Sequence, residues 1–209
     1  MGLMADIAAA SAGIEHARRR LAAGDLATAR SEAEAIIGSA AGGEERCAAH
    51  LVLAVCCDKA GDAAAALEHT RAAVDCAPGD PVAYYANAEQ QEASGDKAGA
   101  IASLRRAIEI EPRFARALRY LGILFGEGGD TEGAIAVLEE ALLIEPNHSR
   151  AWNNLGNAQR TLGRLAEAER SFARALALQP DYPLAAANLG DRLTMEAVHE
   201  ERGRAYDGP

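Results

Sequence analysis

The chain has 209 residues and a net charge of −10, and 49% of its residues are apolar but only 4% are aromatic. Small side chains and the scarcity of β-branched runs favour an all-helical fold. The negative charge disfavours nucleic acid and anionic membrane surfaces as partners, because both are themselves anionic.

The N-terminal segment and the cysteines favour a cytoplasmic location. The short apolar stretch after Asp6 has no basic segment before it, so no secretory signal is predicted. No run is long enough to span a bilayer, so membrane insertion is not expected. The cysteines show neither a C-x-x-C pair nor zinc-ligand spacing, and we expect buried, reduced thiols without a metal or cofactor at Cys47, Cys56, Cys57 and Cys76.

Residues 10–43 are the first expected pair of helices. Gly24 and Asp25 separate the two, because glycine suits the residue after a helix and aspartate accepts hydrogen bonds from the first turn of the next. This pair is a degenerate copy of the segments that follow, and it is three residues out of register with them. The stretch Gly42 to Arg46 takes up the difference.

Four consecutive segments then repeat one another at a spacing of 34 residues, over 47–80, 81–114, 115–148 and 149–182. The proline that ends each segment is Pro78, Pro112, Pro146 and Pro180. The glycine between its two helices is Gly61, Gly95, Gly129 and Gly163. Two alanine columns keep the same register, Ala66, Ala100, Ala134 and Ala168, and Ala73, Ala107, Ala141 and Ala175. We predict a helix-turn-helix unit for each copy.

The residues of the last full copy resemble the signature of the tetratricopeptide repeat family. The matching positions are Trp152, Leu155, Gly156, Ala168, Phe172, Ala175 and Pro180. Gln159 departs from the signature, since an aromatic residue is usual there, and Asn87 departs in the copy over 81–114, where leucine is usual. The resemblance implies a single right-handed α-α superhelical solenoid over 1–209, of about twelve helices, with a polar capping helix over 183–206.

The resemblance also implies a concave groove lined by the first helix of each copy. In its C-terminal half, the groove positions carry arginine and asparagine, with Ile123 and Gly126 between them. The predicted peptide-binding residues are Arg116, Arg119, Tyr120, Arg150, Asn153, Asn154, Asn157, Arg160 and Asn188. Arginine and asparagine supply donors for carboxylates and peptide backbones, so we expect an acidic or C-terminal peptide segment as ligand. The alternative is that these are solvated residues without special affinity.

The N-terminal half of the groove is apolar and then acidic. Its possible apolar contacts are Leu51, Val52, Val55 and Tyr85. Three explanations stay open for the apolar patch at residues 51–55: the degenerate first copy covers it, a second protomer covers it in a homo-oligomer, or a ligand docks on it.

No motif of catalysis or nucleotide binding is present in the sequence, so no catalytic residue is predicted. The preferred function is a non-catalytic scaffold that binds a protein or peptide segment in the groove. Two alternatives remain, a targeting module of a larger enzyme such as a transferase, and a self-assembling scaffold.

Overall fold

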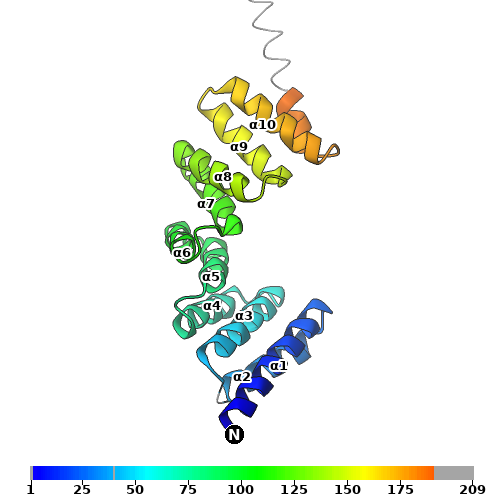
Figure 1. The fold of residues 1–209 in the computed structure, drawn as a ribbon, viewed down its shortest axis with the longest axis vertical. Helices are drawn as coiled ribbons and strands as arrows, with labels where there is room; N and C mark the ends of the chain where they lie inside the picture. Colours follow the sequence, from blue (N-terminus) through cyan, green and yellow to red (C-terminus); the bar gives the residue numbers. More distant parts are fainter. Residues whose placement is uncertain (1, 40, 191–209) are drawn as a thin grey trace, which may run out of the picture. The chain divides into compact units, whose positions relative to one another are not determined.

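The computed structural model describes residues 2–39 and 41–190, and this part of the chain consists of helices and short turns without a strand (Figure 1). Its long helices are α1 (Gly2–Ala22), α2 (Leu26–Ile37), α3 (Gly43–Lys59), α4 (Ala63–Cys76), α5 (Pro81–Ala93), α6 (Lys97–Ile110), α7 (Ala115–Gly128), α8 (Thr131–Ile144), α9 (Ser149–Thr161) and α10 (Leu165–Leu178). A further helical segment runs over 183–190. The predicted all-helical class is confirmed.

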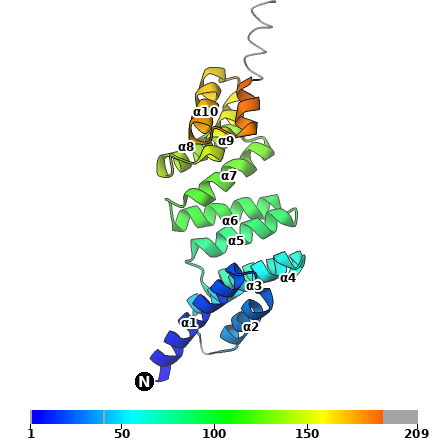
Figure 2. The same ribbon diagram turned by 90° about the vertical axis from the view of Figure 1, so that its right-hand side faces the viewer.

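Tertiary contacts divide the chain into two compact units, Met1–Phe114 and Ala115–Pro209. Unit 1 contains α1 to α6, and unit 2 contains α7 to α10. Within each unit, consecutive helices pack side by side, as Figure 2 shows for α3 with α4 and for α5 with α6. First helices of successive pairs also touch, α1 with α3, α3 with α5, and α7 with α9.

The helix starts follow the repeat read from the sequence. Helices α5, α7 and α9 begin at Pro81, Ala115 and Ser149, the first residues of the expected copies. Helix α3 begins four residues before its expected copy, at Gly43, where two glutamates in its first turn complement the helix dipole. The expected capping helix over 183–206 begins at residue 183, and its part from residue 191 lies outside the described residues. The hand of the superhelix stays a prediction.

The turn inside each of the five helix pairs contains a glycine, and in four of them an aspartate follows. The glycine between the two helices has a positive φ of 73° to 87°, at Gly24, Gly61, Gly95, Gly129 and Gly163. This left-handed conformation strains residues with a Cβ atom, so only glycine adopts it at little cost. An aspartate follows and accepts a hydrogen bond from a backbone N–H three residues later, at Asp25, Asp62, Asp96 and Asp130. The predicted aspartate caps are confirmed.

Glycine and alanine allow the two helices of a pair to approach closely. A Cβ atom built on Gly156 would lie 2.6 Å from Cε1 of Phe172, and one on Gly122 would lie 2.6 Å from Cγ of Leu138. Ala168, which faces the same interface from the second helix, is buried. The predicted close contacts at these positions are confirmed.

Both departures from the family signature lie in buried polar pairs. In unit 1, Asn87 accepts a hydrogen bond from Thr70 and donates one to Ser103, each at 3.1 Å. Ser103 in turn donates to Oε1 of Gln91 at 2.7 Å. In unit 2, Ser171 donates to Oε1 of Gln159, also at 2.7 Å, and these two residues lie two repeats after Ser103 and Gln91. Gln91 occupies the position in its copy that Gln159 occupies in the last full copy, so a glutamine–serine bond is present in both where the signature has an aromatic residue. This bond satisfies the buried polar atoms.

No helix of the described residues is both long and apolar enough to cross a membrane.

Candidate binding site

Helices α7 and α9 enclose a pocket of about 340 Å³ in unit 2, which we call the α7–α9 pocket. It contains two half-buried amide side chains from α9, Asn154 and Asn157, opposite the partly exposed Ile123 of α7. Gly126 leaves space beside Ile123, because it has no side chain. The remaining lining residues are Gly122, Glu127, Ala134, Leu138 and Ala158.

The amides of this pocket can hydrogen-bond a peptide backbone, because each offers both a donor group and an acceptor. Nη2 of Arg160 donates to Oδ1 of Asn157 at 3.1 Å. The same guanidinium lies 5.7 Å from the ring centroid of Phe172, in a cation–π arrangement. These contacts hold Asn157 and Arg160 in place before any ligand binds.

Asn153 lies in the interior, although the sequence predicts it beside Asn154 and Asn157 in the groove. Only 3% of its surface is exposed. Its Oδ1 accepts a hydrogen bond of 3.0 Å from Nδ2 of Asn188, which joins α9 to the helical segment 183–190. Asn153 therefore has a packing role, and the expectation that it faces a ligand is corrected. Asn188, half-buried, has its amide engaged in the same bond.

The predicted arginines have different surroundings. Arg119 is ion-paired with Glu145, the residue that ends α8, and its side chain is 16% exposed. Arg116 and Arg150 are exposed on the first turns of α7 and α9. Tyr120 is half-buried on α7. Arg119 thus helps to fix α7 against the end of α8, whereas Arg116 and Arg150 are more exposed.

The predicted apolar contacts of unit 1 are mainly internal. Val52 is 3% exposed and packs in a core with residues of α1 and α2, so the degenerate first pair covers it. Tyr85 is 9% exposed, with its ring 5.6 Å from that of Phe114. Both are too buried to serve as the surface contacts expected from the sequence. Val55 is exposed, and half-buried Leu51 lines a cavity of about 680 Å³ with Val82.

The four cysteines are free thiols whose side chains are buried or half-buried. Cys47, Cys56 and Cys57 are buried, Cys76 is half-buried, and all four are free thiols. Burial, with Asp80 nearby, raises the pKa of the Cys47 thiol to about 12, so it stays protonated and unreactive. No group of three or more metal-ligating side chains occurs within the described ranges.

His50 and His69 form a contact between α3 and α4. Their Nδ1 atoms lie 3.2 Å apart. Burial lowers the pKa of both imidazoles, and each also has a cationic neighbour, Arg46 beside His50 and Arg30 beside His69. The lowered pKa values favour the neutral rings, and the hydrogen bond between them needs only one ring whose Nδ1 is unprotonated.

One charged residue of the α7–α9 pocket, Glu127, is not among the residues predicted from the sequence. Glu127 follows Gly126 and lines the pocket beside the two amides. It lies outside the groove positions that the resemblance implies, so only the packing of α7 against α9 could identify it.

Comparison with known proteins agrees with the repeat fold. A family model described as tetratricopeptide repeat matches residues 14–81, 85–145 and 122–183. The fold is similar to a crystal structure of MamA, with a TM-score of 0.69 and 24% identity, over 78% of this chain and 94% of that one. It is also similar to YrrB, described as a TPR protein with an unusual peptide-binding site, with a TM-score of 0.68 and 16% identity, over 84% and 89% of the two chains.

A third similar structure is that of pilF from Pseudomonas aeruginosa, with a TM-score of 0.68 and 26% identity, over 79% of this chain and 75% of that one. No curated protein matches the chain in sequence.

Proposed function

Because the chain belongs to the tetratricopeptide repeat family, whose repeats are in general protein-interaction modules, we propose that it is a non-catalytic scaffold that binds a peptide segment in the α7–α9 pocket. The observation that carries the proposal is the pair of amides, Asn154 and Asn157, which line the pocket opposite an apolar side chain. Such a pair can bond a peptide backbone while Ile123 contacts one ligand side chain.

The preferred ligand is acidic or ends in a free carboxylate. Arg116 and Arg150 are exposed on the first turns of the two helices that form the pocket, and Arg160 follows Asn157 by one turn of α9. Guanidinium groups bind carboxylates through two parallel hydrogen bonds, which adds orientation as well as affinity. The carboxylate of Glu127 lines the pocket and would repel an acidic group there. We therefore expect the acidic groups of the ligand to lie near the arginines and its neutral backbone near the amides.

The pocket is preorganised, and this favours binding. The bond from Arg160 to Asn157 holds a pocket side chain that a free surface would leave mobile. A receptor that is ordered beforehand loses little conformational entropy when a ligand binds. The description of YrrB as a TPR protein with an unusual peptide-binding site supports peptide recognition by a fold of this kind.

We place this activity in the cytoplasm, since the four free thiols are compatible with a reducing compartment.

The test is selection of C-terminal peptides from a displayed library, followed by fluorescence anisotropy with the selected peptides. We expect enrichment of acidic residues and at least tenfold weaker binding by an Asn154→Ala, Asn157→Ala double variant. Asn147→Ala is the matched control, because Asn147 is an exposed amide in the turn between α8 and α9. Equal binding by the double variant and the wild type would contradict the proposal. Amidation of the peptide carboxylate separates a terminal-carboxylate preference from an acidic side-chain preference.

A further inference from the structure

A second open surface lies on the other side of α9. Helices α8 and α10 both pack against α9 but make almost no contact with each other, so α9 is the floor of a cleft between them. This α8–α10 cleft has a volume of about 820 Å³, within the range of ligand-binding sites, about 300–1,000 Å³. At 100° per residue, the α9 residues of the cleft lie on the face of the helix opposite Asn154 and Asn157. The cleft is therefore separate from the α7–α9 pocket.

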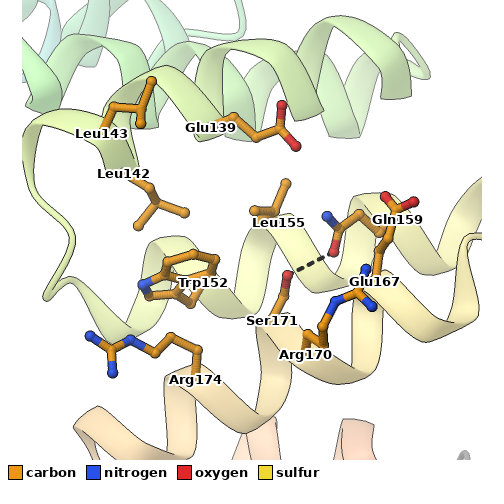
Figure 3. Close-up of a pocket in the computed structure, with 10 residues that line it drawn as sticks. All are labelled: Glu139, Leu142, Leu143, Trp152, Leu155, Gln159, Glu167, Arg170, Ser171 and Arg174. Atoms are coloured by element: carbon orange, nitrogen blue, oxygen red, sulfur yellow. Dashed lines mark hydrogen bonds between the residues drawn. The ribbon is translucent and has the colours of Figure 1, made fainter.

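The floor of the cleft is apolar and fixed (Figure 3). Trp152 and Leu155 of α9 line it together with Leu142 of α8. Nε1 of Trp152 donates a hydrogen bond of 2.8 Å to the carbonyl oxygen of Pro146, which fixes the indole. Toward the far end of the floor, the bond between Ser171 and Gln159 satisfies both polar groups. Leu142 and Leu155 are only 5% and 3% exposed, so the accessible apolar surface of the floor belongs to the half-buried ring of Trp152.

The two walls differ in charge (Figure 3). Helix α8 contributes Glu139 and Leu143, which lie four residues apart. Leu143 is 84% exposed, more than any other large apolar residue among the described side chains. Helix α10 contributes Arg170 and Arg174, also four residues apart and both exposed, and the half-buried Glu167 one turn before Arg170. Neither of these arginines forms an ion pair or a side-chain hydrogen bond with another residue that the structure describes.

We propose that the α8–α10 cleft binds an amphipathic helix of a partner protein, with leucine or aromatic residues on the floor, acidic residues facing Arg170 and Arg174, and a basic residue facing Glu139. The proposal is independent of peptide binding in the α7–α9 pocket. Its basis is charge complementarity across an apolar floor, together with an exposed leucine that has no partner within the chain's described part.

The length of the cleft matches that of a short helix. The floor runs from Trp152 to Gln159, and the α10 wall from Glu167 to Arg174. Seven residues of helix span about 10 Å, so the cleft matches the anchors at i, i+4 and i+7 of a partner helix. A partner helix with charges of opposite sign on its two flanks also binds in only one direction.

The test uses the full chain and a displayed library of helical peptides, with leucine or phenylalanine at i, i+4 and i+7 and randomised flanks. We expect selection of peptides with acidic residues on one flank. Leu143→Glu should weaken binding of the selected peptides at least tenfold without unfolding the protein, because Leu143 is exposed. An Arg170→Glu, Arg174→Glu double variant should instead select peptides with basic residues on that flank.

Two controls assign the binding to the cleft. Leu184→Glu changes another exposed leucine, 63% exposed in the segment 183–190, and should leave binding unchanged. The Asn154→Ala, Asn157→Ala variant should also bind as the wild type does, which separates this site from the α7–α9 pocket. The proposal is overturned if no peptide is enriched, or if Leu143→Glu binds as tightly as the wild type. Concentration-dependent self-association that Leu143→Glu abolishes would identify a second copy of the chain as the occupant, and would also overturn it.

Discussion

Asn153, Asn154 and Asn157 lie within a turn and a half of α9, yet their surroundings differ. Asn153 is buried and bonded to Asn188, whereas the other two line the α7–α9 pocket. Adjacent residues of a helix point about 100° apart, so one asparagine can belong to the interior while the next belongs to the surface. The role of each amide follows from its direction and not from its residue type.

We predict effects of different size on stability for two alanine substitutions in this group. Asn153→Ala removes a buried amide and leaves the Asn188 amide without its acceptor, which should destabilise the protein by about 1–3 kcal/mol. Asn157→Ala removes a half-buried surface amide and should change stability by less than about 0.5 kcal/mol. Thermal unfolding followed by circular dichroism measures both. Equal loss of stability in the two variants would show that Asn153 has no special packing role.

At the scale of the element, four second helices have an aspartate cap and α10 does not. Asp25, Asp62, Asp96 and Asp130 each accept a hydrogen bond from the first turn of the helix that follows. The corresponding residue before α10 is Arg164, which makes no side-chain cap bond. Its guanidinium instead lies 3.5 Å from a carboxylate oxygen of Glu132, in an exposed pair that contributes little.

We therefore expect Arg164→Asp to stabilise unit 2. The backbone N–H of Glu167 now donates to the carbonyl oxygen of Arg164 at 3.2 Å. The carboxylate of an aspartate at position 164 can accept from this N–H and places a negative charge at the positive end of the helix dipole, a gain of about 1 kcal/mol. Arg164→Ala is the control, since it removes the same pair with Glu132 without adding a cap. A melting temperature of the aspartate variant no higher than that of the alanine variant would contradict the prediction.

Helix α9 begins with a cap that depends on pH. Nδ1 of His148 accepts a hydrogen bond of 3.2 Å from the backbone N–H of Ala151. Burial, followed by the nearby charge of Arg119, lowers the pKa of His148. A protonated imidazole has no free acceptor, so the cap exists only while His148 is neutral.

Because the pKa of His148 is lowered in the folded chain, we expect the free energy of unfolding to decrease as the pH is lowered. In the unfolded chain His148 binds a proton near pH 6.5, and in the folded chain only at lower pH. The contribution of the His148 cap to stability is therefore complete above about pH 6.5 and is lost as pH falls through the folded pKa. His148→Asn retains a cap that does not titrate and should lose less stability between pH 7.5 and pH 5.5 than the wild type. Melting temperatures at the two pH values measure the difference. His50 and His69 titrate in both proteins, so an unchanged pH dependence would exclude a contribution from His148.

At the scale of the whole molecule, each helix of the described residues contacts, within its own unit, helices close to it in the sequence. In such an architecture, stability is roughly a sum over repeats and their nearest-neighbour interfaces. A perturbation should therefore remain near the repeat in which it occurs, and unfolding need not follow a single two-state transition.

Gly156→Ala tests this locality. The added Cβ atom would meet the ring of Phe172, which is 2% exposed and cannot move aside easily, and the expected cost is about 1–3 kcal/mol. We expect faster hydrogen exchange in α9 and α10 and unchanged exchange in α1 to α4, measured by mass spectrometry. Gly128→Ala is the control, because no atom lies within 4 Å of a Cβ built there. Equal acceleration along the whole chain would show global cooperativity instead.

Much of the fold could be predicted from the sequence because its determinants are local and periodic. The glycine turns, the aspartate caps and the close contacts at Gly156 and Gly122 follow from residue type and a spacing of 34 residues, and the structure has them at those positions. Backbone conformation and helix capping depend on a few neighbouring residues, so one sequence suffices to predict them.

Which of the predicted residues line the candidate binding site could not be determined from the sequence, because this depends on tertiary packing. Their positions in the repeat predict Asn153 and Val52 on the groove face. The segment 183–190 instead covers Asn153, and the first helix pair packs over Val52. The structural reason for the two departures from the family pattern, Asn87 and Gln159, is their hydrogen bonds to Ser103 and Ser171, which the sequence does not reveal. The sequence by itself therefore determined the repeat, its turns and its helical class. Tertiary packing alone decided which side chains remain accessible, because burial and hydrogen bonding depend on residues distant in the chain.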